Sequence, residues 1–112
     1  MKFLVILFIS FVFLFGANRD FNLYKKEGKI KGNTLLIIGG IHGDEPGGYF
    51  APAFLEKYYN IKKGNVWIIP NINGDSIIAN TRGLYSDMNR KFSNIDKNDP
   101  DFEIIKKAYK PE

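Results

Sequence analysis

Two short apolar segments, residues 35–38 (LLII) and 66–69 (VWII), restrict most strongly how this chain can fold. Each is typical of a buried strand, because it is apolar throughout and bounded by polar or turn-forming residues. Residues 49–59 lie between them, and Pro52 would kink this helical segment or mark its first turn. Its apolar residues recur at helical spacing: Phe50, Phe54, Leu55 and Tyr58. A strand, a helix and a second strand predict a βαβ unit with parallel strands, and hence an α/β fold.

The first apolar segment runs directly into a glycine-rich polar stretch, residues 39–48 (GGIHGDEPGG). Polar residues at this place lie just past the carboxyl end of a strand, where open α/β sheets bind ligands. His42 and Glu45 are three residues apart and can present a nitrogen and a carboxylate oxygen to one divalent metal. The alternative is an ordinary hydrogen-bonded histidine, because a single H-x-x-E pattern also arises by chance.

The remaining segments surround this unit. Residues 21–24 alternate weakly and predict an edge strand paired with residues 34–38. Residues 71–87 are rich in Asn, Gly, Ser and Asp and predict a long irregular loop after the second strand. Asp99 and Pro100 are typical of a helix start. The helix after them would show one apolar face made by Phe102, Ile105 and Tyr109.

Two of the chain's three arginines lie in the predicted loop and just after it, Arg82 and Arg90, whereas lysine is the chain's usual cation. A guanidinium grips a carboxylate with two parallel hydrogen bonds, and a lysine supplies only a point charge. Asn89 can add a neutral donor beside them. We therefore predict a carboxylate-binding site after the second strand. The alternative is that Asp87 and Arg90 simply pair with each other.

The first 17 residues have the composition of a secretory signal peptide. Lys2 precedes an uncharged apolar run, and small residues follow at Gly16 and Ala17. The run is shorter than the roughly 20 residues of a membrane-spanning helix, so no stable span is expected after cleavage. An uncleaved anchor is the alternative. Residues 18–112 would then form the folded part.

Composition excludes several classes of protein and site. The chain has no cysteine, which excludes disulfides and thiolate metal sites. Any metal must therefore be held by His, Glu or Asp. The net charge of +4 is mild and the lysines are spread along the chain, so we expect no nucleic-acid binding.

In combination, these motifs resemble the zinc metallocarboxypeptidases of the carboxypeptidase A type. In that family an H-x-x-E motif supplies two zinc ligands, matched here by His42 and Glu45. A turn similar to N-P-D-G follows the second strand at residues 70–75. An arginine and then a D-x-N-R-x-F segment bind the substrate carboxylate and polarise the scissile carbonyl, matched here by Arg82, Asn89, Arg90 and Phe92.

The residues of both motifs resemble those of one branch of the family, the periplasmic peptidoglycan carboxypeptidases that set cell shape in helical Gram-negative bacteria. The resemblance implies a Zn²⁺ cofactor held by His42 and Glu45. It implies hydrolysis of the C-terminal residue of peptidoglycan stem peptides (muropeptides), from tripeptide to dipeptide. Arg82 would be catalytic and would bind substrate together with Asn89 and Arg90. The implied fold is the N-terminal part of a mixed, mostly parallel α/β/α sheet.

Two parts of that family's site have no counterpart here. The family's third zinc ligand is a second histidine and its general base is a later glutamate, whereas this chain has one histidine. No spacing argues for Asp44 or Asp87 as a ligand. We therefore expect an N-terminal fragment that is inactive alone. Its sheet should be incomplete, with residues 66–69 lacking a neighbour on one side.

Two other functions fit the same motifs. One is a non-catalytic module that recognises muropeptide carboxylates through Arg82 and Arg90. The other is an amidohydrolase similar to succinylglutamate desuccinylase and aspartoacylase, a cousin branch that shares H-x-x-E and an N-R pair but is usually cytosolic. The predicted signal peptide favours the periplasmic carboxypeptidase over this cousin.

Overall fold

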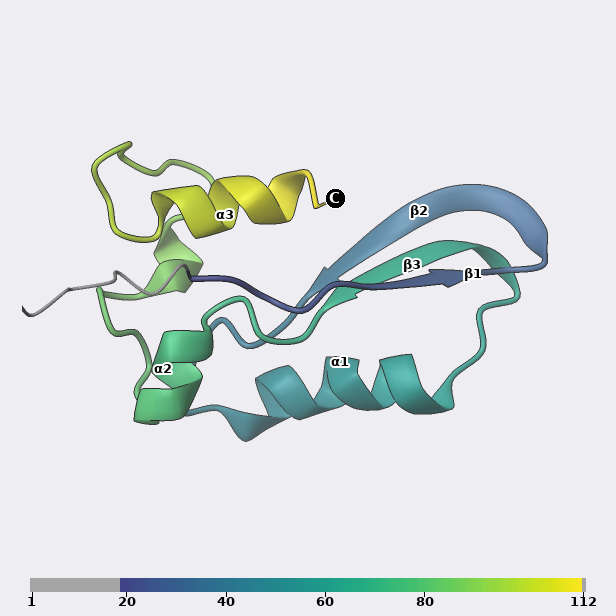
Figure 1. The fold of residues 1–112 in the computed structure, drawn as a ribbon, viewed down its shortest axis with the longest axis horizontal. Coiled ribbons are helices and arrows are strands. Elements are labelled where there is room, and N and C mark those ends of the chain that lie inside the picture. The colour runs from purple at the N-terminus through teal and green to yellow at the C-terminus, as the bar shows by residue number, and fades with distance from the viewer. Residues whose placement is uncertain (1–18, 112) are drawn as a thin grey trace, which may run out of the picture.

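The computed structural model describes residues 19–111, so the predicted signal peptide lies outside the described residues. Within this range the chain forms three strands, three α-helices and one short 3₁₀-helix (Figure 1). Figure 1 shows α1 (Pro46–Tyr58) running along one side of the sheet. It shows α3 (Phe102–Tyr109) on the other side, near the end where the parallel strands finish. This arrangement confirms the predicted α/β class.

The sheet has the order β1–β3–β2, with β1 at Tyr24–Glu27, β2 at Ile30–Ile38 and β3 at Lys63–Ile69. β2 and β3 are parallel, with Ile38 opposite Ile69 at their carboxyl ends. This pairing confirms the predicted βαβ unit. β1 is antiparallel to β3, so the sheet is mixed.

The structure corrects two expectations about this sheet. The first strand begins at Tyr24, not at residue 21, and pairs with β3 instead of β2. β3 is therefore central, and the strands that lack a neighbour on one side among the described residues are β1 and β2, not residues 66–69. The reason is that the turn between β1 and β2 crosses the start of β3, where the Gly28 N–H donates to the Gly64 carbonyl at 2.8 Å.

The long loop predicted at residues 71–87 contains a helix that the sequence pattern did not reveal, α2 (Gly74–Ala79). It has six residues, too few for a helical repeat of apolar residues to show. Its C-cap is Asn80, whose φ of 51° lies in the left-handed region that suits a helix end. A 3₁₀-helix, η1 (Met88–Arg90), follows and carries two of the predicted substrate-binding residues.

α3 begins later than predicted and turns a different face inward. Its N-cap is Asp101, not Asp99, because the Asp99 carboxylate accepts the Asp101 N–H at 2.8 Å and forms a turn ahead of the helix. Ile105 is buried as expected, whereas Tyr109 is 55% exposed. The buried residues of α3 are Ile104, Ile105 and Ala108.

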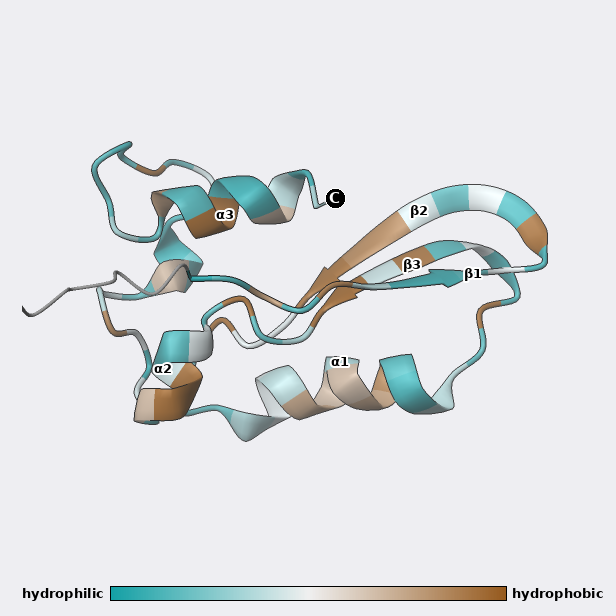
Figure 2. Cartoon of the chain, in the orientation of Figure 1, coloured by the Kyte–Doolittle hydropathy of each residue, from teal (hydrophilic) through white to brown (hydrophobic). Residues whose placement is uncertain are grey.

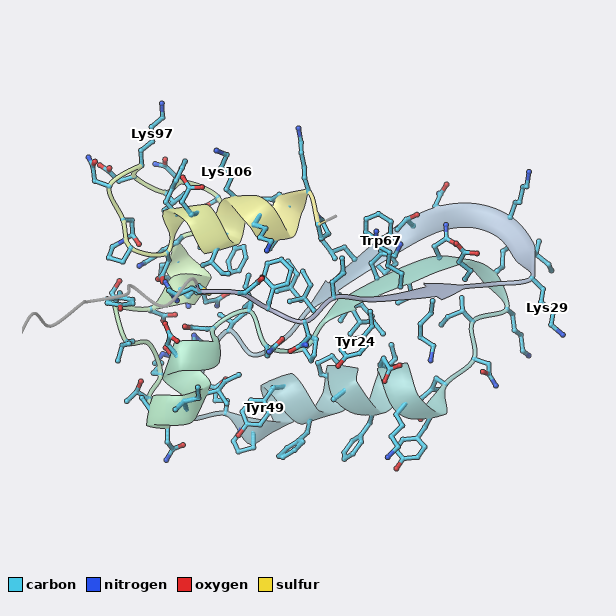
Figure 3. All side chains as sticks on the ribbon, in the orientation of Figure 1. Tyr24, Lys29, Tyr49, Trp67, Lys97 and Lys106 are labelled. Carbon is cyan, nitrogen blue, oxygen red and sulfur yellow. The ribbon has the colours of Figure 1, made fainter. Side chains whose placement is uncertain are left out.

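The core lies between α3 and the carboxyl ends of β2 and β3. Figure 2 shows hydrophobic residues gathered at these strand ends and on α3. Ile30, the first residue of β2, and Leu35, just past its middle, are more than half exposed. Figure 3 shows Lys29 at the far tip of the sheet, away from α2 and α3. The buried residues of this core cluster are Ile69, Ile72, Met88, Ile104, Ile105 and Ala108. The best-packed part of the chain is therefore next to the loops that follow β2 and β3.

None of the helices within residues 19–111 combines the length and the apolarity that a membrane span requires.

Candidate active site

The turn after β2 is tied to the segment after β3. The Gly39 N–H donates to the Ile69 carbonyl at 2.6 Å, and the Ile72 N–H donates back to the Gly39 carbonyl at 3.1 Å. Gly40 has a φ of 68°, and a Cβ there would lie 2.5 Å from the carbonyl oxygen of Pro70. Glycine is required at this position for both reasons. The two loops are therefore held in direct contact.

Pro52 gives this turn a second anchor. It lies inside α1, neither in the first turn nor beyond the helix. Because proline has no N–H, the carbonyl of Gly48, four residues earlier, lacks its usual helical partner. The Gly40 N–H donates to that carbonyl at 2.9 Å. The missing helical hydrogen bond is thus replaced by one that fixes the glycine turn just before His42.

His42 lies between two carboxylates. Its Nδ1 is 3.1 Å from Oε2 of Glu45, and its Nε2 is 2.7 Å from Oδ1 of Asp87. The hydrogen bond to Asp87 raises the pKa of His42 above its ordinary 6.5, although burial acts against it. The same hydrogen bond lowers the pKa of Asp87 to about 2, and the contact with His42 also lowers the pKa of Glu45. Both carboxylates are therefore ionised at neutral pH.

Arg82 closes a ring of four residues. Its Nη1 donates to Oε1 of Glu45 at 3.0 Å, and its Nε and Nη2 each donate to Oδ2 of Asp87 at 3.2 Å. Its side chain is half exposed, so these ion pairs add little to stability. Their effect is geometric: the guanidinium from the loop after β3 is held against the His42–Glu45 pair from the loop after β2.

Asn89 and Arg90 follow on η1, which Asp87 caps. The Asp87 side chain accepts the Asn89 N–H at 3.0 Å, and its carbonyl accepts the Arg90 N–H at 3.1 Å. The Arg90 side chain is 74% exposed, with its Nε 3.8 Å from Oδ2 of Asp87. The local Asp87–Arg90 pair that we considered as an alternative is therefore present, at a distance that leaves Arg90 open to solvent.

A cavity of about 250 Å³ opens at this cluster. His42, Glu45 and Asn89 line it together with the glycine turn, so three of the predicted site residues face one space. A larger cavity of about 560 Å³ lies between Arg19 and the lysines of α3. It contains no histidine, and its acidic lining is Glu103 alone, so the smaller cavity is the one that carries the predicted chemistry.

The His42–Glu45 pair fits two ligands of a zinc ion. Two ligands each about 2.0–2.1 Å from a tetrahedral Zn²⁺ lie roughly 3.3 Å apart. The Nδ1–Oε2 distance of 3.1 Å is close to that value. Asp87 faces the opposite ring nitrogen and so cannot bind the same ion as Nδ1. Among residues 19–111 no group of three or more His, Cys, Asp or Glu is placed to hold a metal.

Asp87 is the residue whose part in this cluster the sequence did not reveal. Its carboxylate contacts His42, which precedes it by 45 residues, and also Arg82 and the backbone of Asn89. A carboxylate on the far nitrogen of a metal-binding histidine fixes the ring's orientation and tautomer. Nothing in local spacing relates Asp87 to His42, because only the contact between the two loops brings them together.

An imidazole and a carboxylate face one point at the carboxyl ends of parallel strands, with two arginines and an amide on the next loop. On an α/β sheet, these features are typical of the metallocarboxypeptidase class. The chain belongs to the family described as the catalytic part of the carboxypeptidase controlling helical cell shape, which matches residues 1–110. This membership confirms the resemblance, and the family implies a metal cofactor.

Solved structures agree with this family. The apo form of the cell shape determinant protein Csd4 from Helicobacter pylori is 38% identical over 79% of this chain and 22% of its own, with a TM-score of 0.70. Its mDAP-bound form, described as a D,L-carboxypeptidase, is 40% identical over 75% of this chain and 21% of its own, with a TM-score of 0.66. This chain therefore spans about a fifth of the Csd4 chains.

A further structure belongs to the cousin branch. An aspartoacylase family protein from Mesorhizobium loti is 29% identical over 77% of this chain and 28% of its own, with a TM-score of 0.62. No curated protein matches the chain.

Proposed function

We propose that this chain provides part of a zinc-dependent carboxypeptidase that removes the C-terminal residue of peptidoglycan stem peptides, converting tripeptide to dipeptide. One observation carries the proposal: His42, Glu45, Arg82 and Asp87 form a closed ring of contacts in a chain of the cell-shape carboxypeptidase family. The substrate class is supported by similarity to Csd4 structures bound to a tripeptide and to mDAP.

In this proposal His42 and Glu45 hold Zn²⁺ through Nδ1 and a carboxylate oxygen. When bound, the ion would polarise the scissile carbonyl and lower the pKa of a water molecule. Asp87 orients the His42 ring through its other nitrogen, at 2.7 Å. His42 must be neutral to bind a metal, so zinc uptake would release the proton that the two carboxylates favour.

Arg82 and η1 would hold the substrate. Arg82 lies against Glu45 at 3.0 Å, close enough to the metal pair to stabilise charge on the carbonyl oxygen of a substrate bound there. Asn89 lines the same cavity, and the exposed guanidinium of Arg90 is available to bind a terminal carboxylate. These roles make Arg82 the catalytic residue of this chain and Arg82, Asn89 and Arg90 its substrate-binding residues.

We further propose a periplasmic location reached through a signal peptide at residues 1–17. The composition of that segment and the peptidoglycan peptides bound by Csd4 support this location. A second candidate function, an amidohydrolase acting on N-acyl amino acids, is favoured by the similarity to the aspartoacylase family protein. A third, muropeptide binding without turnover, is favoured by the chain's single histidine.

The first test compares His42→Ala with Asp44→Ala, an exposed acidic neighbour in the same turn. Zinc content and release of the terminal residue from a muropeptide tripeptide are measured for the protein as the source cell produces it. We expect His42→Ala to lose zinc and activity, and Asp44→Ala to retain both. Activity retained in His42→Ala would refute the proposal. Hydrolysis of N-acyl amino acids instead, or chelator-insensitive binding without turnover, would select one of the alternatives.

The second test concerns the carboxylate grip, by which we mean the proposed binding of the substrate's terminal carboxylate by Asn89 and Arg90. Arg90→Lys keeps the charge but removes the planar fork, so kcat/KM for a substrate with a free terminal carboxylate should fall on the order of 10-fold. The same peptide amidated at its C-terminus has no carboxylate to grip and should be affected much less. Equal losses on the two substrates would contradict the role of Arg90.

A further inference from the structure

Lys91, the residue directly after Arg90, is buried. Only 9% of its side chain is exposed, whereas Figure 3 shows Lys97 and Lys106 extending away from the body of the protein. Lysine is almost never buried unless it is paired, because removing an ammonium from water is costly. A buried lysine beside the proposed carboxylate grip therefore calls for a specific reason.

The Lys91 ammonium has three N–H groups, and each has an acceptor. It donates to Oδ2 of Asp101 at 2.7 Å, to Oδ1 of Asp99 at 2.8 Å and to the carbonyl of Tyr85 at 3.1 Å. Burial alone would lower the pKa of Lys91, but the hydrogen bonds to Asp101 and Asp99 outweigh it and raise this pKa. Through these contacts Lys91 connects the start of α3 with the loop on which Arg82 lies.

Asp101 extends this network to the metal-binding turn. Its side chain is 2% exposed, and its second oxygen accepts from Nη1 of Arg19 at 2.7 Å. Nη2 of Arg19 donates to the side-chain oxygen of Asn73 at 3.2 Å, and the Asn73 amide donates to the carbonyl of Ile41 at 3.0 Å. Ile41 immediately precedes His42. An unbroken path of hydrogen bonds therefore runs from Lys91 to the turn that carries the proposed zinc pair.

The grip itself lies between two buried anchors. Met88, the first residue of η1, is fully buried in the core, and Lys91 follows its last residue. Asn89 and Arg90 stand between them. Fixing both ends restricts the backbone from which Asn89 and Arg90 extend, so less conformational entropy is lost when they bind a carboxylate.

From these contacts we infer that Lys91 and Asp101 are positioning residues for substrate binding. They hold η1 and the loop of Arg82 at a fixed distance from the His42 turn, without contacting substrate. Three acceptors arranged around one nitrogen suit an ammonium, whereas a planar guanidinium cannot donate equally well to all three. The inference rests on the proposed function, because it assigns these residues to the carboxylate grip of that site.

The test measures carboxylate selectivity by titration calorimetry with the full chain. A stem tripeptide and its C-terminal amide are titrated into the wild type, Lys91→Met and Asp101→Asn. A charge-assisted bidentate contact is worth about 1.5–3 kcal/mol, so the wild type should bind the free carboxylate about 10- to 100-fold more tightly than the amide. Lys91→Met and Asp101→Asn should bring this ratio close to 1 while affinity for the amide stays within about 3-fold.

The matched control is Lys107→Met. Lys107 forms an equally short lysine–aspartate pair, 2.7 Å to Asp20, but its side chain is half exposed and it lies in the last turn of α3. It should keep the wild-type selectivity. A loss of selectivity in Lys107→Met equal to that in Lys91→Met would overturn the inference, and so would full selectivity in Lys91→Met.

Two further outcomes are decisive. If circular dichroism shows that Lys91→Met and Asp101→Asn do not fold, Asp99→Asn replaces them. Asp99 is 23% exposed and provides one of the three acceptors, so its loss should reduce the ratio 2- to 10-fold. An unchanged ratio would overturn the inference. A wild type that does not distinguish carboxylate from amide contradicts the proposed grip itself, and the inference with it.

Discussion

Gly43 is where the turn that carries His42 touches α2, and replacing it with alanine should disrupt both. A Cβ at this position would lie 1.9 Å from the carbonyl oxygen of Ser76 and 2.0 Å from its carbonyl carbon. These are backbone atoms of a fully buried residue, so they cannot turn aside. To reach even a tight contact of 3.0 Å, the turn and α2 would have to separate by roughly 1 Å.

The expected cost follows from that separation. Inserting a methyl group into a packed region typically costs about 1–3 kcal/mol. The same Ser76 carbonyl accepts the Thr81 N–H at 3.0 Å, and weakening this hydrogen bond adds about 1 kcal/mol. We therefore expect Gly43→Ala to lower the free energy of unfolding by about 3 kcal/mol. Displacing His42 by about 1 Å should also weaken any function of the site on the order of 100-fold.

Urea unfolding measures this cost, with Gly47→Ala as the matched control. Gly47 lies in the same glycine-rich stretch, but an added Cβ meets nothing within 4 Å. Because it lies in α1, alanine should leave stability unchanged or raise it by up to about 1 kcal/mol. A Gly43→Ala variant within 0.5 kcal/mol of the wild type, or an equal loss in Gly47→Ala, would refute the reasoning.

Two further predictions concern the buried parts of the chain. The hydrogen bond from Lys91 holds the pKa of Asp99 below its ordinary 3.8. The ionised Asp99 carboxylate therefore contributes stability above pH 3.8, and this contribution is lost as the pH falls through the folded-state pKa. Unfolding midpoints measured on either side of about pH 4 should therefore fall less in Asp99→Asn than in the wild type; identical profiles would count against this. Ile105→Ala should cost about 2–5 kcal/mol in urea unfolding, and Ile78→Ala, at an 87% exposed position, less than about 0.5 kcal/mol; similar costs would contradict the observed core.

Local pattern was sufficient for part of the fold. The apolar segments at residues 35–38 and 66–69 predicted two strands, and the structure confirms that β2 and β3 are parallel. The H-x-x-E spacing predicted that His42 and Glu45 would face each other, and their side chains do so at 3.1 Å. These features depend on residues close in sequence: the strands follow from backbone periodicity, and the His42–Glu45 contact forms within a single turn. The roles assigned to His42, Glu45, Arg82, Asn89 and Arg90 stay predictions.

Local pattern was insufficient where contacts span long distances along the chain. It paired residues 21–24 with the wrong strand, missed the six-residue α2 and misplaced the apolar face of α3. For β1 the outcome was decided by a competing contact, the Gly28–Gly64 hydrogen bond that places it beside β3. Short elements carry too few residues for their period to be read.

The sequence by itself determined the chemistry available to this protein: one histidine, no cysteine, three arginines and a glycine-rich turn after a strand. Only the tertiary structure decided how these groups meet. It places Asp87 on the far nitrogen of His42, Arg82 against Glu45 and the buried Lys91 against Asp101. The physical reason is that side chains 37 to 45 residues apart come within hydrogen-bonding distance only after two loops have packed against a common core.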